Sequence, residues 1–399
     1  MKKASQLATL VLTGFILAVV FHYFQSAYLG LPYPYNTFLF TPLDRFADFF
    51  VLYRVNLDLN PYLAHACAQY PFTNWLFVLF SRMPEAPAFG LYTLLTIVSF
   101  ASLIFFFLKE EPAPNKIILA FLSYPFLFTV DRGNVEGLLY VLLALFVLFF
   151  VQKRFWQSAI LLGLAGAMKI YPLIFAPLFL IQKRYKETGI LILTFLSASL
   201  LPLFFFQGGF LANLQFVLHG SNFVNPIYDL FLGPAAFVQR GVSLFTFLKI
   251  LLIQFGWIDG VDMGILLKGY FVFIILFAIP YLFYAFFIEK TFWKQIALLT
   301  FGMLLFPHIS ADYKLIHLFL PILLFLTAPP RRDDAVYWIA FGLLLIPKAY
   351  FFLPNIQSDS GTTDISIGVV LNVLIMLFLI LYIVFTGIQS RKEASVSAS

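Results

Sequence analysis

Long apolar runs separated by short polar stretches form the dominant pattern of this chain. The runs are rich in Phe, Leu, Ile and Val and carry few charges, which is typical of helices that cross a lipid bilayer. They predict roughly a dozen membrane-spanning segments, near residues 5–24, 86–108, 116–130, 135–151, 156–168, 170–181, 189–207, 265–288, 293–307, 315–328, 335–352 and 365–388.

Several of these runs are too short to cross a bilayer. A helix of 14 residues rises only about 21 Å, against a hydrocarbon core of about 30 Å. Polar backbone at that depth is tolerated only beside protein or a water-filled cavity. We therefore expect a cavity on the outer side, faced by four polar turns, "TPLDRFADFF" at 41–50, "DRGNVE" at 131–136, "AMKIYP" at 167–172 and "FPHISADYK" at 306–314.

Two long stretches between the runs are predicted to be outer loops. Residues 25–85 and 208–264 are rich in aromatic side chains and have broken amphipathic character, which favours interfacial helices lying on the membrane surface. No internal repeat is visible, so the inverted-repeat signature of many transporters is missing.

Composition excludes a soluble protein. Hydrophobic residues make up 62% of the chain and charged residues 11%, and so few charges cannot cover a water-exposed surface at this length. We expect an all-α polytopic membrane helix bundle in which residues 1–399 form one integral membrane domain.

The basic residues predict the topology of this bundle. They fall in small clusters between the runs rather than in a basic stripe, so nucleic acid is not an expected partner. Placing the clusters in the cytoplasm puts both termini there, including a tail at 389–399. The first run lacks a small-residue cleavage site, which favours a signal anchor over a cleaved signal peptide.

Neither a disulfide nor a metal site is expected. Cys67 is the single cysteine, so it has no partner for an internal disulfide. No cluster of Cys and His with zinc-like spacing occurs in the sequence. We therefore predict no metal and no cofactor.

The first polar turn contains two aspartates with different expected roles. Thr41 suits an N-cap, Pro42 a first helical residue and Asp44 the acid of a capping box. Asp48 has no role in this helix cap. It could pair with Arg45 at a spacing of three, or present a carboxylate to the cavity as a general base.

The second polar turn suggests a helix start at a sharp bend. Gly133 supplies the bend, Asn134 is a good N-cap, and Glu136 lies in the first turn where the helix dipole favours an acid. Asp131 and Arg132 could neutralise each other. Alternatively, Arg132 and free backbone amides could hold a phosphate or sugar hydroxyls.

The remaining polar turns offer cations and a histidine. Lys169 could extend to a membrane interface or hold a lipid-linked phosphate. Asp312 and Lys314 could be a solvated pair, and His308 could bond backbone carbonyls. Alternatively, His308, Asp312 and Tyr313 could contact substrate.

The order of these stretches resembles glycosyltransferase family 87. The resemblance rests on "ADFFVLYRVNLDLNPY", "YPF…LFSRMP", "DRGNVE", "MKIYPLIFAPLFL", "QRGVSLF" and "FPHISADYKLIHLFLP", and runs from about residue 40 to 330. The family comprises GT-C-type membrane enzymes that include polyprenol-phosphate-mannose-dependent mannosyltransferases. Many relatives read His-Tyr where this chain has Asp312 and Tyr313, so His308 or His317 could take the place of that histidine.

The resemblance implies an inverting sugar transfer on the extracytoplasmic side, most plausibly of mannose. A polyprenyl-phosphate sugar would be the donor, a glycolipid or glycan the acceptor, and a bacterial plasma membrane the location. The catalytic base would be Asp48, and Arg240 joins the cations that could stabilise the departing phosphate. The predicted substrate-binding residues are Asp44, Arg45, Asp131, Arg132, Asn134, Glu136, Lys169, Arg240, His308, Asp312 and Tyr313.

Two other classes stay open at this point. A transporter or flippase of lipid-linked saccharides would need polar groups through the whole membrane depth, whereas here they gather on one predicted side. A purely structural membrane protein would leave the shared placement of the polar turns unexplained.

Overall fold

Helices dominate the protein. The structure, a computed structural model, describes residues 3–40, 45–65, 67, 69–219, 233–234, 236, 238–353, 357–358, 361–362 and 364–398. Helices account for 74% of it and strands for almost nothing. The predicted all-α class is confirmed.

The chain divides into two compact units. Unit 1 comprises residues 1–41, 104–128 and 232–399, and unit 2 comprises residues 42–103 and 129–231. Two of the four boundaries fall inside helices, at 103/104 in α4 (Glu85–Phe107) and at 128/129 in α6 (Tyr124–Arg132). The expectation that 1–399 form one integral membrane domain stays a prediction.

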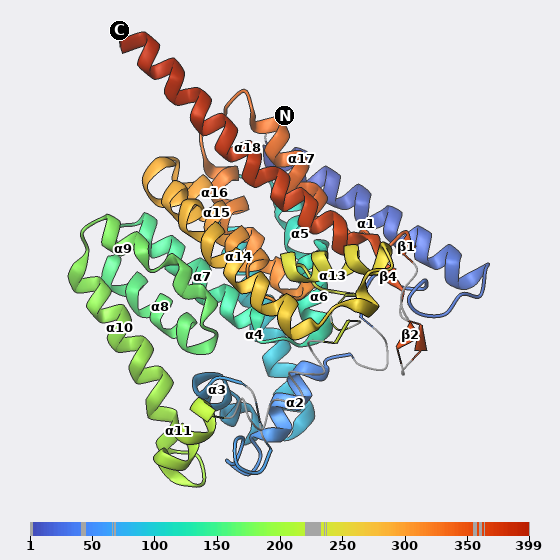
Figure 1. The fold of residues 1–399 in the computed structure, drawn as a ribbon, viewed down its shortest axis with the longest axis vertical. Coiled ribbons are helices and arrows are strands. Elements are labelled where there is room, and N and C mark those ends of the chain that lie inside the picture. The colour runs from blue at the N-terminus through green and yellow to red at the C-terminus, as the bar shows by residue number, and fades with distance from the viewer. Residues whose placement is uncertain are drawn as a thin grey trace. The chain divides into compact units, whose positions relative to one another are not determined.

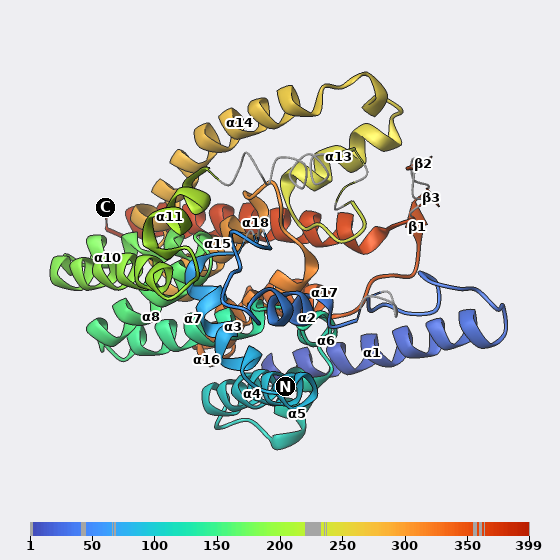
Figure 2. The same cartoon turned by 90° about the horizontal axis from the view of Figure 1, so that it is seen from below.

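Unit 2 is built on the helices α7, α8 and α10, of which α8 packs against both of the others (Figure 2). Gly163 on α8 allows α10 to come close, because a Cβ there would lie 2.8 Å from Cβ of Thr194. Small residues at helix interfaces are typical of membrane bundles. The elements of this unit besides parts of α4 and α6 are α2 (Ala47–Val55), α3 (Pro71–Ser81), α7 (Glu136–Val151), α8 (Phe155–Met168), η2 (Tyr171–Phe175), α9 (Pro177–Ile181), α10 (Tyr185–Leu200), η3 (Leu201–Phe204) and α11 (Gly209–His219).

Unit 1 packs its first helix against helices from the middle and end of the chain. Helix α1 contacts α5 and α17, and α18 contacts α13, α15 and α17 (Figure 1). The elements of this unit besides parts of α4 and α6 are α1 (Lys3–Ala27), α5 (Ala113–Phe121), α13 (Leu244–Gln254), η4 (Ile258–Gly260), α14 (Met263–Phe283), η5 (Tyr284–Ile288), α15 (Phe292–Leu305), η6 (Asp312–Leu318), α16 (Phe319–Thr327), α17 (Asp334–Leu345) and α18 (Ile367–Ala398).

Two small antiparallel ribbons precede α18. Strand β1 (Phe352–Leu353) pairs with β4 (Ile365–Ser366), and β2 (Gln357–Ser358) pairs with β3 (Gly361–Thr362). The hydrophobicity pattern gave no sign of either ribbon, because strands of two residues are too short to show alternation.

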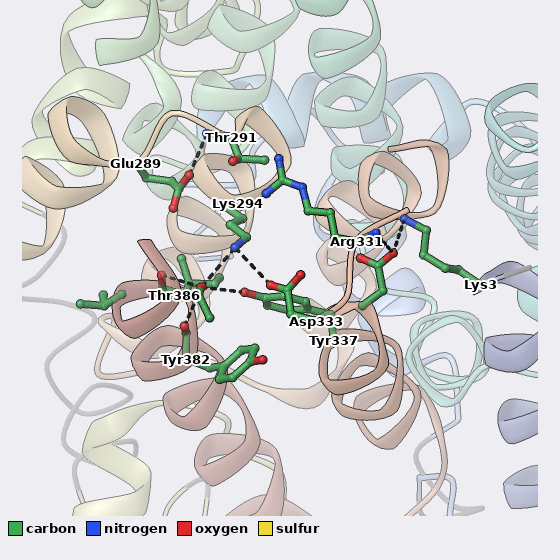
Figure 3. A network of polar contacts seen from close by, with 12 residues as sticks. Lys3, Glu289, Thr291, Lys294, Arg331, Asp333, Tyr337, Tyr382 and Thr386 are labelled. Atoms are coloured by element: carbon green, nitrogen blue, oxygen red, sulfur yellow. Dashed lines mark hydrogen bonds and ion pairs between the residues drawn. The ribbon is translucent and has the colours of Figure 1, made fainter. Parts of the chain in front are cut away.

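A polar network ties five helices of unit 1, α1, α15, α16, α17 and α18, together at one end (Figure 3). The buried ammonium of Lys294 on α15 donates to Thr386 on α18 at 3.2 Å and pairs with Asp333 at 3.8 Å. Lys3 on α1 pairs with Asp334 at 3.3 Å and donates to two carbonyls at the end of α16. Basic residues from three predicted cytoplasmic clusters, those at Lys3, Lys294 and Arg331, therefore lie at the same end of this unit.

Within the part of the chain that the structure describes, five helices are long and apolar enough to cross a membrane, α1, α4, α10 with η3, α14 with η5, and α18. A sixth arises if α5 and α6 are counted as one bent span. Shorter apolar helices occupy the predicted runs at 135–151, 156–168, 170–181, 293–307 and 335–352. Their shortness agrees with the sequence, while the number of them that cross the bilayer stays a prediction.

One predicted span is broken in the structure. The run 116–130 forms α5 and α6, which meet at an angle of 46°. Pro125 explains the break, because it lacks a backbone N–H and its ring would clash with the carbonyl four residues earlier in a continuous helix. Ser123 accordingly lies outside both helices.

The predicted outer loops contain short helices. The loop 25–85 contains α2 and α3, and the loop 208–264 contains α11, α13 and η4. Ser243 caps α13 by accepting the amide of Thr246, as its residue type favours. That these helices lie on a membrane surface stays a prediction.

Candidate functional site

Asp48 lies in the first turn of α2, in unit 2. The helix begins at Ala47 because Phe46 adopts a left-handed conformation with φ of 58°, which interrupts regular helix. Asp48 is therefore at the positive end of the helix dipole, where an acid is favoured. The proposed cap and first helical turn at 41–44, including Asp44, lie outside the described residues.

Three N–H groups hold the carboxylate of Asp48. Arg132 donates to both of its oxygens, through Nη2 to Oδ1 and through Nε to Oδ2 at 3.2 Å. Asn134 donates from Nδ2 to Oδ2 at 2.5 Å. The Asp48 side chain keeps 24% of its surface exposed, so it is fixed in orientation yet accessible.

The ion pairs of this region connect the first polar turn with the second. Asp48 pairs with Arg132, and Arg45 pairs with Asp131 at 3.6 Å from Nε to Oδ1. The backbone N–H of Phe46 also donates to the carbonyl of Asp131 at 2.8 Å. The local pairing of Asp48 with Arg45 considered from the sequence is therefore not the one formed.

Asn134 joins Asp48 to the start of α7. Its Oδ1 accepts the backbone N–H of Glu136 at 3.0 Å. The helix begins at Glu136 with Val135 as its N-cap and no side-chain cap bond there, so the start predicted at Asn134 is displaced along the chain. Gly133 has φ of 60°, and a Cβ at this position would lie 2.9 Å from Cβ of Phe49. The bend predicted at Gly133 is confirmed, and the close approach of α2 requires the glycine.

Glu136 is fully buried, and its carboxylate accepts a hydrogen bond from the hydroxyl of Tyr171 in η2. Lys169 lies two residues before Tyr171, at the end of α8, in extended conformation. Its side chain is half-buried, and its charge acts on the buried thiol of Cys67. Among the described residues its ammonium group has no hydrogen bond or ion pair.

A second polar group lies in unit 1, where two loops distant in sequence pair. The backbone N–H of Asp312 donates to the carbonyl of Arg240 at 2.9 Å, and that of Val242 donates to Ser310 at 2.8 Å. Gly241 and Ala311 form an isolated antiparallel bridge. This pairing places "QRGVS" beside "HISAD" and brings Arg240 next to Asp312.

Arg240 and Asp312 line a cavity in unit 1 together with Tyr124, Lys348 and Asn372. The hydroxyl of Tyr124 donates to Oδ2 of Asp312 at 2.6 Å. The ammonium of Lys348 donates to the carbonyls of Leu343 and Ile346 at the end of α17, at 2.6 and 2.8 Å. Asp312 thus bonds a tyrosine rather than forming the solvated pair with Lys314.

The other residues of this turn are placed differently. His308 packs edge-on against Phe245 and Phe271, and burial lowers the pKa of its imidazole. Tyr313 is half-buried. In the described part of the chain, neither residue lines the cavity of Arg240 and Asp312.

Sequence reasoning missed Tyr124, Lys348 and Asn372. Lys348 interrupts the apolar run "LLLIPKAYFFLP", and a lone charge in such a run is itself a signal of a functional position. Asn372 lies inside the last span, where a polar side chain is equally out of place. Tyr124 carried no comparable signal among so many aromatic residues.

Comparison with known proteins identifies the family. The sequence model of glycosyltransferase family 87 matches residues 70–307, which is more than half of the chain. The alpha-(1->3)-arabinofuranosyltransferase of Corynebacterium glutamicum is 29% identical over 146 residues, which are 35% of this chain and 32% of that protein. The chain thus spans about a third of the length of this curated relative. By the extent of the family match, the chain belongs to glycosyltransferase family 87.

Proposed function

We propose that this protein transfers a sugar from a polyprenyl-phosphate carrier to a hydroxyl of a glycolipid or glycan, with inversion at the anomeric carbon and with Asp48 as general base. Membership of the family supports sugar transfer. The long apolar helices support a donor that is carried by a lipid. We place the reaction on the extracytoplasmic side of a bacterial plasma membrane, following the distribution of basic residues.

The environment of Asp48 is the observation that carries the proposal. A carboxylate offers about four acceptor positions on its two oxygens. Arg132 and Asn134 fill three of them, so one position remains among the described residues for the hydroxyl of an acceptor. The orientation is fixed before the substrate arrives, which favours catalysis.

One base is enough for this reaction. The acceptor oxygen bonds to the anomeric carbon while the bond from that carbon to the phosphate oxygen breaks. The phosphate leaves with the electron pair, and the hydroxyl proton passes to Asp48. Because a phosphate is a good leaving group, no strong general acid is needed, in contrast to a glycosidase with two carboxyl groups.

Lys169 is our candidate for a cation in unit 2 that meets the departing phosphate. Its half-buried ammonium group has no protein partner among the described residues, and a cation at the developing charge lowers the barrier. The other substrate contacts that we propose in this unit come from Asp44, Arg45, Asp131, Arg132, Asn134 and Glu136. In unit 1 we propose His308 and Tyr313, with Arg240 and Asp312.

Mannose is the sugar that we propose, following the resemblance to mannosyltransferases of the family. The name of the relative from Corynebacterium glutamicum indicates arabinofuranose for that protein. Parallel assays with polyprenyl-phosphate mannose and polyprenyl-phosphate arabinofuranose would decide between the two donors. Faster transfer from the arabinofuranose donor would overturn the choice of mannose and leave the role of Asp48 intact.

Substitution of the base provides the main test. We expect Asp48→Asn to lower kcat for transfer from a radiolabelled polyprenyl-phosphate sugar by about 100-fold or more, since general bases contribute about 10²- to 10⁴-fold. Asp58→Asn is the matched control, because this exposed acid serves a loop contact with His65. It should leave kcat unchanged.

Thermal unfolding of the same variants separates catalysis from folding. An Asp48→Asn protein that melts like the wild type but does not transfer sugar supports the proposal. Full activity of Asp48→Asn would refute it. Transmembrane flux of a lipid-linked saccharide by the purified wild type, without any sugar transfer, would instead show a flippase.

A further inference from the structure

Two turns of unit 2 share a short sequence. Residues 149–155 read "FFVQKRF" and residues 179–185 read "FLIQKRY". The first turn joins α7 to α8, and the second joins α9 to α10. Each turn leaves its Gln, Lys and Arg exposed. We call residues 152–156 and 182–186 together the paired basic turns.

The two turns also share a backbone conformation that lysine disfavours. Lys153 and Lys183 are left-handed, with φ of 59° and 56°. In each turn the N–H of the following arginine donates at 2.8 Å to the carbonyl of a phenylalanine five residues earlier, which closes the preceding helix. Glycine is the usual residue at this position, because a Cβ costs free energy there. The backbone therefore does not account for a lysine in both turns.

Aromatic contacts hold the two turns side by side. The guanidinium of Arg184 lies over the ring of Phe155, 4.2 Å from its centroid, and so reaches from the second turn to the first. The ring of Phe150 packs against both Phe155 and Phe179, with centroids 5.4 Å apart in each case. The cations of the two turns consequently share one surface of unit 2.

Both arginines are held in place by a ring and keep N–H groups for a ligand. Arg154 lies over Phe149 at 4.5 Å, as Arg184 does over Phe155. Nε of Arg154 donates to Gln157 at 2.7 Å. Among the described residues, the terminal nitrogens of both arginines make no hydrogen bond. A guanidinium fixed in this way presents a planar fork that matches a phosphate.

The paired basic turns concentrate positive charge. Their five cations are Lys153, Arg154, Lys183, Arg184 and Lys186. In the region that the structure describes, none of the five forms an ion pair. The adjacent acid, Glu187, is half-buried. Charge complementarity therefore favours a negatively charged partner.

The surroundings favour a lipid over a soluble anion. Trp156 and Tyr185 are 57% and 66% exposed within the paired basic turns, and the exposed Val151 and Ile181 adjoin them. Exposed Trp and Tyr among basic residues are typical of the headgroup level of a membrane. Tyr185 is also the first residue of a helix that is long and apolar enough to cross a bilayer. The cations thus lie where headgroups would be.

We propose that the paired basic turns bind the phosphate headgroup of an anionic phospholipid, with Arg154 and Arg184 on the phosphate and with the lysines adding charge. The distribution of basic residues assigns this lipid to the cytoplasmic leaflet. Basic pockets between membrane helices on that side suit anionic headgroups. The site is independent of Asp48 and of the sugar donor.

Native mass spectrometry of the full chain in a non-ionic detergent tests this site. The protein is titrated with phosphatidylglycerol, which is anionic, and with phosphatidylcholine of the same acyl chains, which is zwitterionic. Glycerophosphoglycerol, the soluble headgroup of phosphatidylglycerol, is the probe for a soluble anion. For the first molecule bound, we expect phosphatidylglycerol to bind the wild type at least about tenfold more tightly than either of the others.

A double variant and a matched control report on the two arginines. Arg154→Gln with Arg184→Gln should weaken binding of phosphatidylglycerol by about 10- to 30-fold, since each basic residue adds to the attraction. Lys290→Gln with Arg332→Gln removes the same charge from exposed positions of other basic clusters. This control should bind phosphatidylglycerol like the wild type.

Substitution of the two lysines separates stability from binding. Lys153→Gly with Lys183→Gly places glycine in both left-handed positions. In detergent without anionic lipid, its melting temperature should equal or exceed that of the wild type. Its affinity for phosphatidylglycerol should nevertheless fall several-fold, because two charges are lost.

Trp156 reports where the lipid binds. In nanodiscs, phospholipids with brominated acyl chains quench nearby tryptophans, and the difference between the wild type and Trp156→Phe gives the quenching of Trp156. We expect stronger quenching by brominated phosphatidylglycerol than by brominated phosphatidylcholine. This excess should vanish in the double-arginine variant.

Three results would overturn the site. They are wild-type affinity for phosphatidylglycerol in the double-arginine variant, an equal loss in the control variant, which would show diffuse attraction, and binding of glycerophosphoglycerol as tight as that of the lipid, which would show a soluble anion. If the double-arginine variant melts early, Arg154→Lys with Arg184→Lys keeps the charge without the planar fork. It should bind phosphatidylglycerol with intermediate affinity, and wild-type affinity would refute the role of the guanidinium groups.

Discussion

Asp48 and Asp312 show how one residue type is prepared for two tasks. Asp48 accepts three N–H groups and keeps 24% of its side chain exposed, which fixes its orientation and leaves it open to an acceptor hydroxyl. Asp312 is 5% exposed and accepts one hydroxyl, from Tyr124. Burial raises the pKa of Asp312 to about 6, against the opposing effects of Tyr124, Arg240 and Lys348.

This raised pKa predicts how donor binding depends on pH. The ionised carboxylate of Asp312 accepts a sugar hydroxyl better than the protonated acid does, so the ligand should bind the ionised form. Binding should therefore be strongest above pH 6 and weaken as the pH falls through about 6. Calorimetric titration of the protein in lipid nanodiscs with a short-chain prenyl phosphodiester of the donor sugar between pH 5 and 8 measures this, because a diester has no phosphate pKa in that range.

Asp312→Asn is the control for the pH dependence. It should bind more weakly at pH 7.5 and lose the dependence near pH 6. A wild-type affinity that is constant from pH 5 to 8 would contradict the prediction. A pH dependence that persists unchanged in Asp312→Asn would point to another titratable group, such as Lys348 in the lining of the same cavity.

For single residues, the sequence predicted local backbone roles better than it predicted which side chains pair with each other. Gly133 as a bend follows from local backbone preferences and is confirmed. The side chain of Asn134 accepts an amide at the start of α7, but Val135 and not Asn134 is the N-cap of that helix. The crossed pairs of Asp48 with Arg132 and Arg45 with Asp131 could not be predicted. They depend on packing between segments more than 80 residues apart, whereas spacing rules describe neighbours on one helix.

The corner between α6 and α7 is the element on which the Asp48 arrangement depends. Arg132 ends α6, Gly133 turns the chain, and Asn134 accepts the backbone N–H of Glu136, the first residue of α7. Because these three residues are consecutive, a small backbone shift at the corner moves both Arg132 and Asn134, the partners of Asp48. The corner must also admit α2, whose Phe49 lies against Gly133.

Gly133→Ala should therefore destabilise the protein and reduce activity together. The left-handed conformation costs a residue with a Cβ about 1–2 kcal/mol, and the contact with Phe49 at 2.9 Å adds to this cost. We expect a loss of roughly 2 kcal/mol or more in the free energy of unfolding in detergent.

The matched control for this glycine is Gly90→Ala in the second turn of α4. A Cβ there meets no atom within 4 Å, and alanine has the higher helix propensity. The melting temperature of Gly90→Ala should be unchanged or slightly higher. Equal melting temperatures for Gly133→Ala and the wild type would show that the corner tolerates a side chain.

Element boundaries followed the apolar runs closely where a run formed one helix. The run 135–151 became α7 (Glu136–Val151), and 156–168 became α8 (Phe155–Met168). The prediction of one continuous helix over the run 116–130 was wrong, because a hydropathy pattern does not register the break that Pro125 causes. The bridge at Gly241 and Ala311 was also out of reach, since isolated backbone pairing leaves no period in the sequence.

At the scale of the whole molecule, the distribution of charge predicts orientation in the membrane. Lys3, Lys294 and Arg331 lie at one end of unit 1, in or beside the polar network that joins α1, α15, α17 and α18 (Figure 3). Basic residues that gather at one end of a membrane bundle favour the cytoplasm. Asp58, in the predicted outer loop 25–85, should accordingly lie on the other side.

Cysteine labelling checks this topology directly. In a Cys67→Ala background, Asp58→Cys should react with a membrane-impermeant maleimide in intact cells, because this side chain is 49% exposed. Arg332→Cys, which is exposed beside the basic cluster, should react only after the membrane is permeabilised. Labelling of both positions in intact cells, or the reverse pattern, would refute the orientation. The reverse pattern would place the proposed reaction on the cytoplasmic side, and labelling of both positions would require another topology. The experiment therefore decides from which side of the membrane the acceptor must come.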